Sequence, residues 1–313
     1  MVEIILYLAG GLLIMLLGAE GLVRGASALA LRIGISPLVV GLTVVAFGTS
    51  SPELVVSIGS AIEGNSDIAI GNVIGSNISN IALILGITAL INPIKVNVQL
   101  IKREIPIMIG VTIVFLLFFY DLSLLRFEGF LLFIGIIVYT VISYKLSKKE
   151  KKETELEFEK EIPRAKGNLF KSILMVVFGL IFLAIGSKLF VDGAIEVALM
   201  LNISQVIIGL TIVAVGTSLP ELITSVVASI KKEGDIAIGN VVGSNIFNLL
   251  SILGLTAIIY PITSESISLL DLGMFSLTAL IMLPLSRTGF ILNRIEGAIL
   301  IGIYVTYIYF LIP

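Results

Sequence analysis

Long apolar stretches separated by short polar segments run through almost the entire chain. A helix that crosses the ~30 Å hydrocarbon core of a bilayer needs about 20 mostly apolar residues. Windows of that length occur ten times, at residues 3–22, 37–61, 68–91, 104–120, 126–144, 169–190, 205–230, 236–260, 268–286 and 294–312. The pattern therefore predicts an all-α polytopic membrane protein with ten transmembrane helices.

The second and third predicted helices are repeated later in the chain. Residues 38–94 align without a gap to residues 206–262, 168 positions further on, and more than half of the paired residues are identical. The strongest blocks are GLTVVAFGTSSPE (Gly41–Glu53) with GLTIVAVGTSLPE (Gly209–Glu221), and DIAIGNVIGSNISN (Asp67–Asn80) with DIAIGNVVGSNIFN (Asp235–Asn248). Two such matches at one spacing indicate a true internal repeat.

The number of helices in each half predicts how the two copies are related. Five is an odd number, so tandem copies must enter the membrane with opposite polarity. We expect two inverted five-helix repeats at residues 1–144 and 169–313, joined by a charged cytoplasmic linker at 145–168. Inverted repeats are typical of secondary transporters, which bind their substrate near the midplane between the repeats.

The composition narrows the possible chemistry. Hydrophobic residues make up 57% of the chain and charged residues only 13%, against about 25% charged in soluble domains, so a soluble enzyme is excluded. The absence of Cys and His excludes thiolate and imidazole metal sites, and any bound cation must be held by oxygen. We expect no enzymatic activity and no cofactor. The formal net charge of -2, with no basic face outside the linker, gives no sign of nucleic-acid binding, and no protein partner is implied.

Basic residues indicate which side of the membrane each loop faces. Lys and Arg are retained in cytoplasmic loops. With the N-terminus outside, 18 of the 20 Lys and Arg residues fall on the cytoplasmic side, and only Arg126 and Lys188 do not. We therefore expect a multi-pass protein of the cell membrane with both termini outside.

Glu53 and Glu221 lie deep within their predicted helices, at the ends of the repeated blocks. No Lys or Arg is predicted in the middle of any helix, and a charge at the bilayer centre costs roughly 2.5–3.5 kcal/mol on insertion scales. Protons or bound cations must therefore neutralise the two carboxylates. Calcium fits an oxygen-only site best, because it takes about 6 to 8 oxygen ligands.

The residues around each glutamate add further oxygen ligands. Pro52 and Pro220 cannot donate to the carbonyl four residues back, so we expect a distorted turn around Thr49 and Thr217 with freed carbonyls. The hydroxyls of Ser50 and Ser218 lie in the same turns. The third helix of each half carries a polar stripe at i, i+4 and i+8, formed by Asn72, Ser76 and Asn80 and by Asn240, Ser244 and Asn248.

The motifs GTSSPE and GTSLPE, each followed by GNVIGSNISN or GNVVGSNIFN, resemble those of the cation/calcium exchanger superfamily, and within it the prokaryotic sodium/calcium exchangers. The resemblance covers both repeats and nearly the whole chain. It implies exchange of one cytoplasmic Ca²⁺ for about three Na⁺ by alternating access, with the first and sixth helices sliding over the remainder.

The resemblance also implies roles for individual residues. Calcium would bind Glu53 and Glu221 with backbone oxygens of Thr49 and Thr217. Sodium would bind Ser50, Ser76, Ser218 and Ser244 with the carbonyls of Ala46 and Ala214. Asn80 and Asn248 would complete the centre, and here the sequence departs from members that carry an acid at one of these positions. Two amides favour a potassium-independent exchanger.

The leading hypothesis is an electrogenic Na⁺/Ca²⁺ antiporter whose only partners are these ions and the lipid bilayer. A proton/Ca²⁺ antiporter of the same fold is an alternative, in which Glu53 and Glu221 exchange calcium for protons. A passive cation channel is a further alternative, in which the inverted repeats form a fixed pore.

Overall fold

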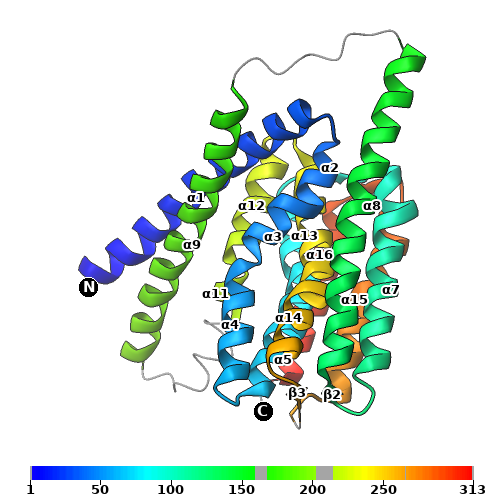
Figure 1. The fold of residues 1–313 in the computed structure, drawn as a ribbon. Coiled ribbons are helices and arrows are strands. Elements are labelled where there is room, and N and C mark those ends of the chain that lie inside the picture. The colour runs from blue at the N-terminus through cyan, green and yellow to red at the C-terminus, as the bar shows by residue number, and fades with distance from the viewer. Residues whose placement is uncertain (1, 159–167, 202–213, 265, 312–313) are drawn as a thin grey trace.

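The computed structural model describes residues 2–158, 168–201, 214–264 and 266–311, and these are helical almost throughout (Figure 1). The first half contains α1 (Val2–Ile33), α2 (Pro37–Val40), η1 (Gly41–Val45), α3 (Ala46–Thr49), α4 (Ser51–Ile62), α5 (Ser66–Ser79), η2 (Asn80–Leu85), α6 (Gly86–Ile91), β1 (Ile94–Lys95), η3 (Leu100–Glu104), α7 (Ile105–Phe118), β2 (Ser123–Leu124) and α8 (Arg126–Phe158). The second half contains α9 (Leu169–Met200), α11 (Ala214–Thr217), α12 (Leu219–Ile230), α13 (Gly234–Phe247), η5 (Asn248–Leu253), α14 (Gly254–Ile259), β3 (Ile262–Thr263), α15 (Leu269–Arg287), β4 (Ile291–Leu292) and α16 (Arg294–Leu311). The η elements are π-helical turns.

Most of the predicted membrane helices are present as long apolar helices. Within the described residues, seven helices are long and apolar enough to cross a membrane, and the number is eight when the bent pair Pro37–Thr49 and Ser51–Ile62 is counted as one span. The helix from Leu100 to Phe118 carries three charged residues, Lys102, Arg103 and Glu104, near its start, and the predicted span at 205–230 falls partly on residues 202–213, outside the described residues. The charged residues keep the predicted span at 104–120 out of that count, and the first part of the span at 205–230 stays a prediction.

The centre of the molecule is formed by the third helix of each half. Buried residues make up 72% of the span Ser66–Ile91 and 83% of the span Gly234–Ile259, whereas none of the other five long apolar helices among the described residues exceeds 33%. The outer helices instead expose large apolar side chains, such as Leu6, Leu117 and Phe127, as expected for surfaces that face lipid. The polar residues of the two central helices are therefore shielded from lipid.

Two short strand pairs connect the halves in a symmetric way. Ile94 of β1 is the partner of Leu292 of β4, and Leu124 of β2 is the partner of Ile262 of β3. Adding 168 to the numbers of Ile94 and Leu124 gives Ile262 and Leu292, so the repeat relation exchanges one strand pair for the other. The two halves therefore interlock about a pseudo-two-fold axis.

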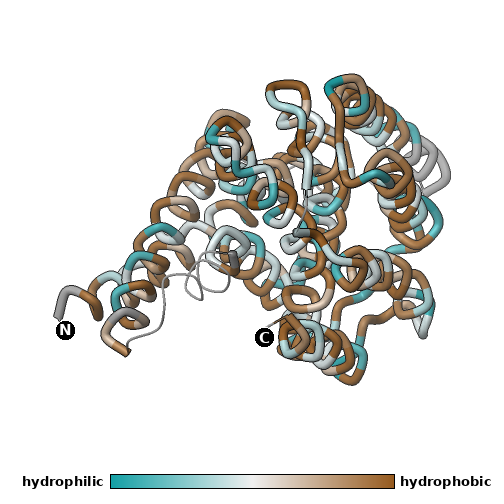
Figure 2. Tube along the Cα trace, turned by 90° about the horizontal axis from the view of Figure 1, so that it is seen from below, coloured by the Kyte–Doolittle hydropathy of each residue, from teal (hydrophilic) through white to brown (hydrophobic). Residues whose placement is uncertain are grey.

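Helices α1 and α9 lie side by side at one edge of the molecule, and α1 also contacts α12 and α2 (Figures 1 and 2). Their backbones approach closely at glycines. A Cβ atom built on Gly11 would lie 2.7 Å from the carbonyl oxygen of Gly186, and one built on Gly179 would lie 2.8 Å from that of Gly18. Any larger residue at these positions would force the two helices apart.

Candidate functional site

The polypeptide breaks its helical course at equivalent places in the two repeats. Between α3 and α4, Ser50 has φ -83° and ψ 7°, and between α11 and α12, Ser218 has φ -90° and ψ 4°. In the first repeat the helix axis bends by 44° there. Proline is the second residue of both following helices and cannot donate a backbone hydrogen bond. The distorted turns predicted around Thr49 and Thr217 are thus present, one residue further along.

The two breaks bring the glutamates to one centre. Glu53 and Glu221 lie in the first turns of α4 and α12, and each is only 1% exposed. The Ser50 hydroxyl donates to Glu221 Oε1 at 2.9 Å, and the Ser218 hydroxyl donates to Glu53 Oε1 at 3.2 Å. Each carboxylate is therefore held by the serine of the other repeat.

No basic side chain compensates these carboxylates in the part of the chain that the structure describes. The ion pairs found there join Glu20 to Arg24 and Lys231, Glu104 to Arg103, and Asp192 to Lys188. The same residues contain no group of three acidic side chains that could hold a metal ion. Two buried negative charges therefore share a centre whose other polar groups are neutral.

The polar stripes predicted on the third helices face this centre. Asn72 donates to the Glu53 carbonyl at 3.2 Å, and Asn240 donates to the Glu221 carbonyl at 3.3 Å. The hydroxyls of Ser76 and Ser218 lie 3.5 Å apart. Asn80 and Asn248 begin the π-helical turns η2 and η5, and such turns frequently occur at functional sites.

Several oxygen atoms at the centre are buried without a protein partner. They are Glu53 Oε2, Glu221 Oε2, Asn80 Oδ1, Asn248 Oδ1 and Ser244 Oγ. A buried acceptor left unsatisfied costs about 1–3 kcal/mol, and more when it is charged. Carboxylate, amide and hydroxyl oxygens are the ligands that hard cations prefer. The centre therefore has the chemistry of a cation site.

The remaining predicted site residues take less direct positions. The Thr49 hydroxyl lies 3.1 Å from the Val45 carbonyl and 3.0 Å from Asn240 Oδ1, and it also interacts with the Glu221 carboxylate. The Ala46 carbonyl accepts the Ser50 N–H at 3.0 Å. Thr217 ends α11. Ala214 begins the same helix, and its side chain lies outside the described residues.

One of the carbonyls that proline was expected to free has a partner from another helix. The Gly216 carbonyl accepts a hydrogen bond from Ser187 of α9 at 2.8 Å. The matching position of α1 is Ala19, which has no hydroxyl. The broken segment of the second repeat is therefore attached to α9 by a contact that the first repeat cannot form.

Two pairs of residues that organise the centre were not among the predicted site residues. Asn77 and Asn245 bond to Asn248 and Asn80 across the pseudo-two-fold axis. Ser57 and Ser225 accept hydrogen bonds from Asn72 and Asn240 at 2.9 and 3.0 Å. Their only signal was that each pair is identical in the two repeats.

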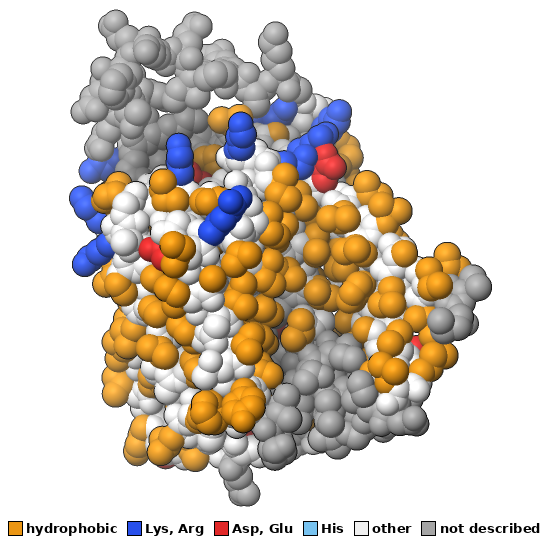
Figure 3. All heavy atoms as spheres, turned by 180° about the vertical axis from the view of Figure 1, so that it is seen from behind, with side chains coloured by type: hydrophobic (Ala, Val, Ile, Leu, Met, Phe, Trp, Pro, Cys, Tyr) orange, Lys and Arg blue, Asp and Glu red, His pale blue; other side chains and the backbone are white. Residues whose placement is uncertain are grey.

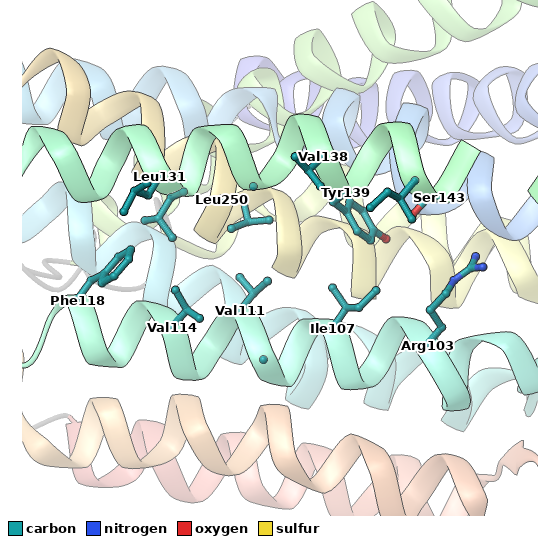
Figure 4. Close-up of a pocket in the computed structure, with 14 residues that line it drawn as sticks. Arg103, Ile107, Val111, Val114, Phe118, Leu131, Val138, Tyr139, Ser143 and Leu250 are labelled. Carbon is teal, nitrogen blue, oxygen red and sulfur yellow. The ribbon is translucent and has the colours of Figure 1, made fainter. Parts of the chain in front are cut away.

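The cavities of the described residues do not suggest a competing site. A cavity of about 10 Å³ lies against Ser50 and is also lined by Phe47, Phe247 and Ser251. A larger cavity of about 410 Å³ lies between α7 and α8, with apolar walls and Arg103 at one end (Figure 4). Neither Glu53 nor Glu221 lines the larger cavity. It therefore offers no carboxylate ligand for a cation from this pair.

Comparison with known proteins identifies what the chain is similar to. Residues 3–145 and 171–312 match the family described as "Sodium/calcium exchanger protein". The chain is 35% identical to the sodium/calcium exchanger MaX1 of Methanosarcina acetivorans, over 95% of both chains. It is 41% identical to the inner membrane protein YrbG of Escherichia coli, over 80% of this chain and 78% of YrbG. Its fold matches a structure of the sodium-calcium exchanger NCX_Mj soaked with Na⁺ and Ca²⁺, with a TM-score of 0.83, 32% identity and coverage of 97% and 96%. These likenesses confirm the expected fold class, an all-helical multi-span membrane protein with two repeats.

Proposed function

This chain belongs to the sodium/calcium exchanger protein family and is a cation/Ca²⁺ antiporter rather than an enzyme, and on that premise we propose that it exchanges one Ca²⁺ for about three Na⁺ by alternating access. The observation that carries this proposal is the pair of buried carboxylates, Glu53 and Glu221, each bonded to a serine of the other repeat and lacking a basic partner among the described residues. Their two negative charges match one divalent cation.

The proposed ligands are those that the sequence motifs imply. Calcium binds both glutamates together with the backbone oxygens of Thr49 and Thr217. Sodium binds Ser50, Ser76, Ser218 and Ser244 with the carbonyls of Ala46 and Ala214, and the amide oxygens of Asn80 and Asn248 complete the centre. The buried oxygens of Glu53, Glu221, Asn80, Asn248 and Ser244 that lack a protein partner support this assignment.

The charge of the centre predicts an electrogenic cycle. Two carboxylates are neutral with one Ca²⁺ but carry one net positive charge with three Na⁺. Moving that charge across the membrane is worth about 2.3 kcal/mol per 100 mV, so a negative cell interior drives calcium out. Because Asn80 and Asn248 are both amides, no third carboxylate calls for another cation, and the exchange should not need potassium.

The positively charged end of the molecule supports the orientation predicted from the sequence. Figure 3 shows Lys and Arg gathered towards one end of the visible face. We place that end in the cytoplasm, with both termini outside, in a cell membrane. Residues 1–144 and 169–313 are the two repeats and residues 145–168 the cytoplasmic connector. Helix α8 extends into this connector as far as Phe158, and residues 159–167 lie outside the described residues.

Ion-driven uptake tests the coupling. We expect purified protein in vesicles to take up radioactive calcium when the vesicles are loaded with sodium and diluted into choline buffer. Potassium-loaded vesicles should show only background uptake. Uptake driven by acid loading alone would instead support the proton/Ca²⁺ alternative, and flux without any counter-ion would support a passive channel.

The pair formed by α1 and α9 is the element that we propose to move between access states. In this structure α1 is attached near the predicted cytoplasmic end of α12. Lys231 pairs with Glu20 at 2.9 Å, and Ser27 donates to Glu233 at the same distance. Helix α9 contacts the corresponding helix α4 much less. The contacts describe a conformation that is closed at the cytoplasmic end.

The other repeat carries this ion pair with reversed charges. The residues 168 positions from Glu20 and Lys231 are Lys188 and Glu63. Lys188 pairs with Asp192 of its own helix at 3.3 Å, and no ion pair to Glu63 is found among the described residues. We propose that Lys188 pairs with Glu63 when the outer end closes, so that one pair opens as the other forms.

Replacing Lys231 by Gln should favour opening at the cytoplasmic end. Because both side chains of the pair are partly exposed, at 29% and 40%, we expect a shift of at most about 1 kcal/mol, or roughly fivefold in population. The chain has no cysteine, so a single introduced cysteine can be labelled with a thiol reagent. Ala228 is buried in a cluster that includes α1 residues. The labelling rate of Ala228→Cys therefore reports how often the cytoplasmic end opens. Faster labelling is expected in Lys231→Gln. Slower labelling is expected in Glu63→Gln, because that change removes the pair proposed for the state that is open at the cytoplasmic end. A Glu20→Lys/Lys231→Glu exchange should restore the original rate. An unchanged labelling rate in Lys231→Gln would contradict the proposed role of the Glu20–Lys231 pair.

A further inference from the structure

Asn77 and Asn245 form a hydrogen-bonded link between the repeats directly beside the proposed cation centre. Each follows a proposed sodium ligand, Ser76 or Ser244, by one residue. Asn77 is 2% exposed and Asn245 is 3% exposed. Neither belongs to the ligand set proposed above, so their burial and polarity require another explanation.

The link is reciprocal across the pseudo-two-fold axis. Asn80 Nδ2 donates to Asn245 Oδ1 at 3.0 Å, and Asn248 Nδ2 donates to Asn77 Oδ1 at 2.9 Å. Asn245 Nδ2 in turn donates to the Asn77 backbone carbonyl at 3.3 Å, and Asn77 Nδ2 donates to the Asn245 carbonyl at 3.4 Å. We call these four asparagines, Asn77, Asn80, Asn245 and Asn248, the amide clasp.

The direction of every hydrogen bond in the clasp is set by the backbone. A carbonyl can only accept, so the group of Asn245 that faces the Asn77 carbonyl must be its NH₂ group. The oxygen of Asn245 then faces Asn80 and accepts only from the NH₂ group of Asn80. The amide of Asn80 is thereby turned so that its oxygen points the other way. Likewise, the NH₂ group of Asn77 faces the Asn245 carbonyl, and its oxygen accepts from the NH₂ group of Asn248.

The oxygens that the clasp turns outward are two of the unpartnered atoms of the centre. Asn80 Oδ1 and Asn248 Oδ1 are buried, and no protein group donates to them. A freely rotating amide could present its NH₂ group instead, which repels a cation and cannot act as a ligand. The orientation of these two amides therefore decides whether they present oxygen ligands or NH₂ groups to a cation at the centre.

We propose that Asn77 and Asn245 are positioning residues, which fix Asn80 and Asn248 with their oxygens towards the transported cation. The proposal rests on the function proposed above, since it needs a cation at this centre. It explains why a residue that is not a ligand is a buried amide in both repeats. A leucine of similar size would fill the same space but would leave Asn80 or Asn248 free to flip.

The test measures calcium binding rather than transport. Asn245→Leu should weaken calcium binding, measured by calorimetry on the purified protein, by about tenfold or more, because a ligand to a charged ion is lost. Asn77→Leu, which acts on Asn248 in the other repeat, should do the same and provides a second variant if the first does not fold. Asn92→Leu is the matched control. It also removes a hydrogen bond between the repeats, to the Ser229 carbonyl at 2.7 Å, and should leave calcium affinity unchanged while lowering the Tm.

A double substitution separates positioning from a purely structural role. Asp at position 80 has oxygen at both ends of its head group and needs no orientation. We therefore expect Asn80→Asp in the Asn245→Leu background to regain calcium binding, whereas two structural defects would simply add. Unchanged affinity in both Asn245→Leu and Asn77→Leu would overturn the proposal, as would additive losses in the double variant. Wild-type protein that binds no calcium would instead overturn the proposed function itself.

Discussion

Replacing either glutamate at the centre by glutamine should abolish calcium transport while leaving the protein folded. Glu53→Gln and Glu221→Gln keep the side-chain shape, and glutamine can still accept the hydrogen bond from Ser218 or Ser50. What is lost is one of the two charges that match a divalent cation. We expect calcium transport to fall at least about a hundredfold, since truncating a charged partner in a buried site costs several kcal/mol.

Thermal unfolding distinguishes a lost ligand from a damaged fold. A ligand that binds only the folded state adds about 2.7 kcal/mol of stability at a concentration of 100 times its Kd. Calcium should therefore raise the Tm of the wild type but not that of either glutamine variant, and the Tm without calcium should not fall. Glu296→Gln is the control, because Glu296 is also buried but caps α16 through the Asn293 N–H at 2.8 Å. Normal transport in either site variant would exclude that glutamate from the centre.

Replacing a glycine between α1 and α9 by a larger residue should also reduce transport. A Cβ atom on Gly11 would lie 2.7 Å from both the Gly186 carbonyl oxygen and the Phe190 backbone nitrogen. Backbone atoms cannot rotate away, so Gly11→Leu must separate the two helices that we propose to move together. We expect transport to fall at least about tenfold, measured as sodium-driven calcium uptake.

The adjacent glycine provides the control for this substitution. A Cβ atom on Gly10 meets no described atom within 4 Å, so Gly10→Leu places the same side chain on the same helix without forcing the pair apart. Wild-type uptake is expected in Gly10→Leu. Equal uptake in Gly10→Leu and Gly11→Leu would show that close packing of α1 on α9 is not needed for the cycle.

Hydropathy predicted where the membrane helices lie along the chain, but it did not predict how long they are. The window at 126–144 predicts a helix that ends where the apolar residues end, yet α8 extends to Phe158. The added segment is rich in Lys and Glu, which favour helix in water. A hydropathy window measures the thickness of the hydrocarbon core, and it carries no information on a helix that extends beyond the membrane.

The chemistry of the centre was predictable where it depends on local sequence. The prolines at positions 52 and 220 predicted the helix breaks because their effect reaches only one turn. The stripe of Asn72, Ser76 and Asn80 was predictable from helical spacing. Asn77 lies one residue, or about 100°, away from that stripe, so it belongs to another face of the helix. Its partner, Asn248, is 171 residues away, and only the packing of one repeat on the other brings them together.

The close approach of helices can be read from the sequence only in part. Gly239 and Gly243 lie in the repeated block, where small residues let backbones approach, and a Cβ atom on Gly243 would lie 2.6 Å from the Leu42 carbonyl oxygen. The matching neighbours of Gly71 and Gly75 would come from residues 206–210, which lie outside the described residues. The glycines of α1 and α9 carried no obvious signal, since glycine is common in membrane helices.

The central claim is that two carboxylates bind either one Ca²⁺ or three Na⁺, so that each cycle moves one positive charge. The most direct test is the calcium accumulated at equilibrium by sodium-loaded vesicles whose membrane potential is set with potassium and valinomycin. One charge across ~60 mV corresponds to about 1.4 kcal/mol, so an inside-positive step of that size should raise the limiting calcium ratio about tenfold. A ratio that does not change with the potential would mean electroneutral exchange and would contradict this account.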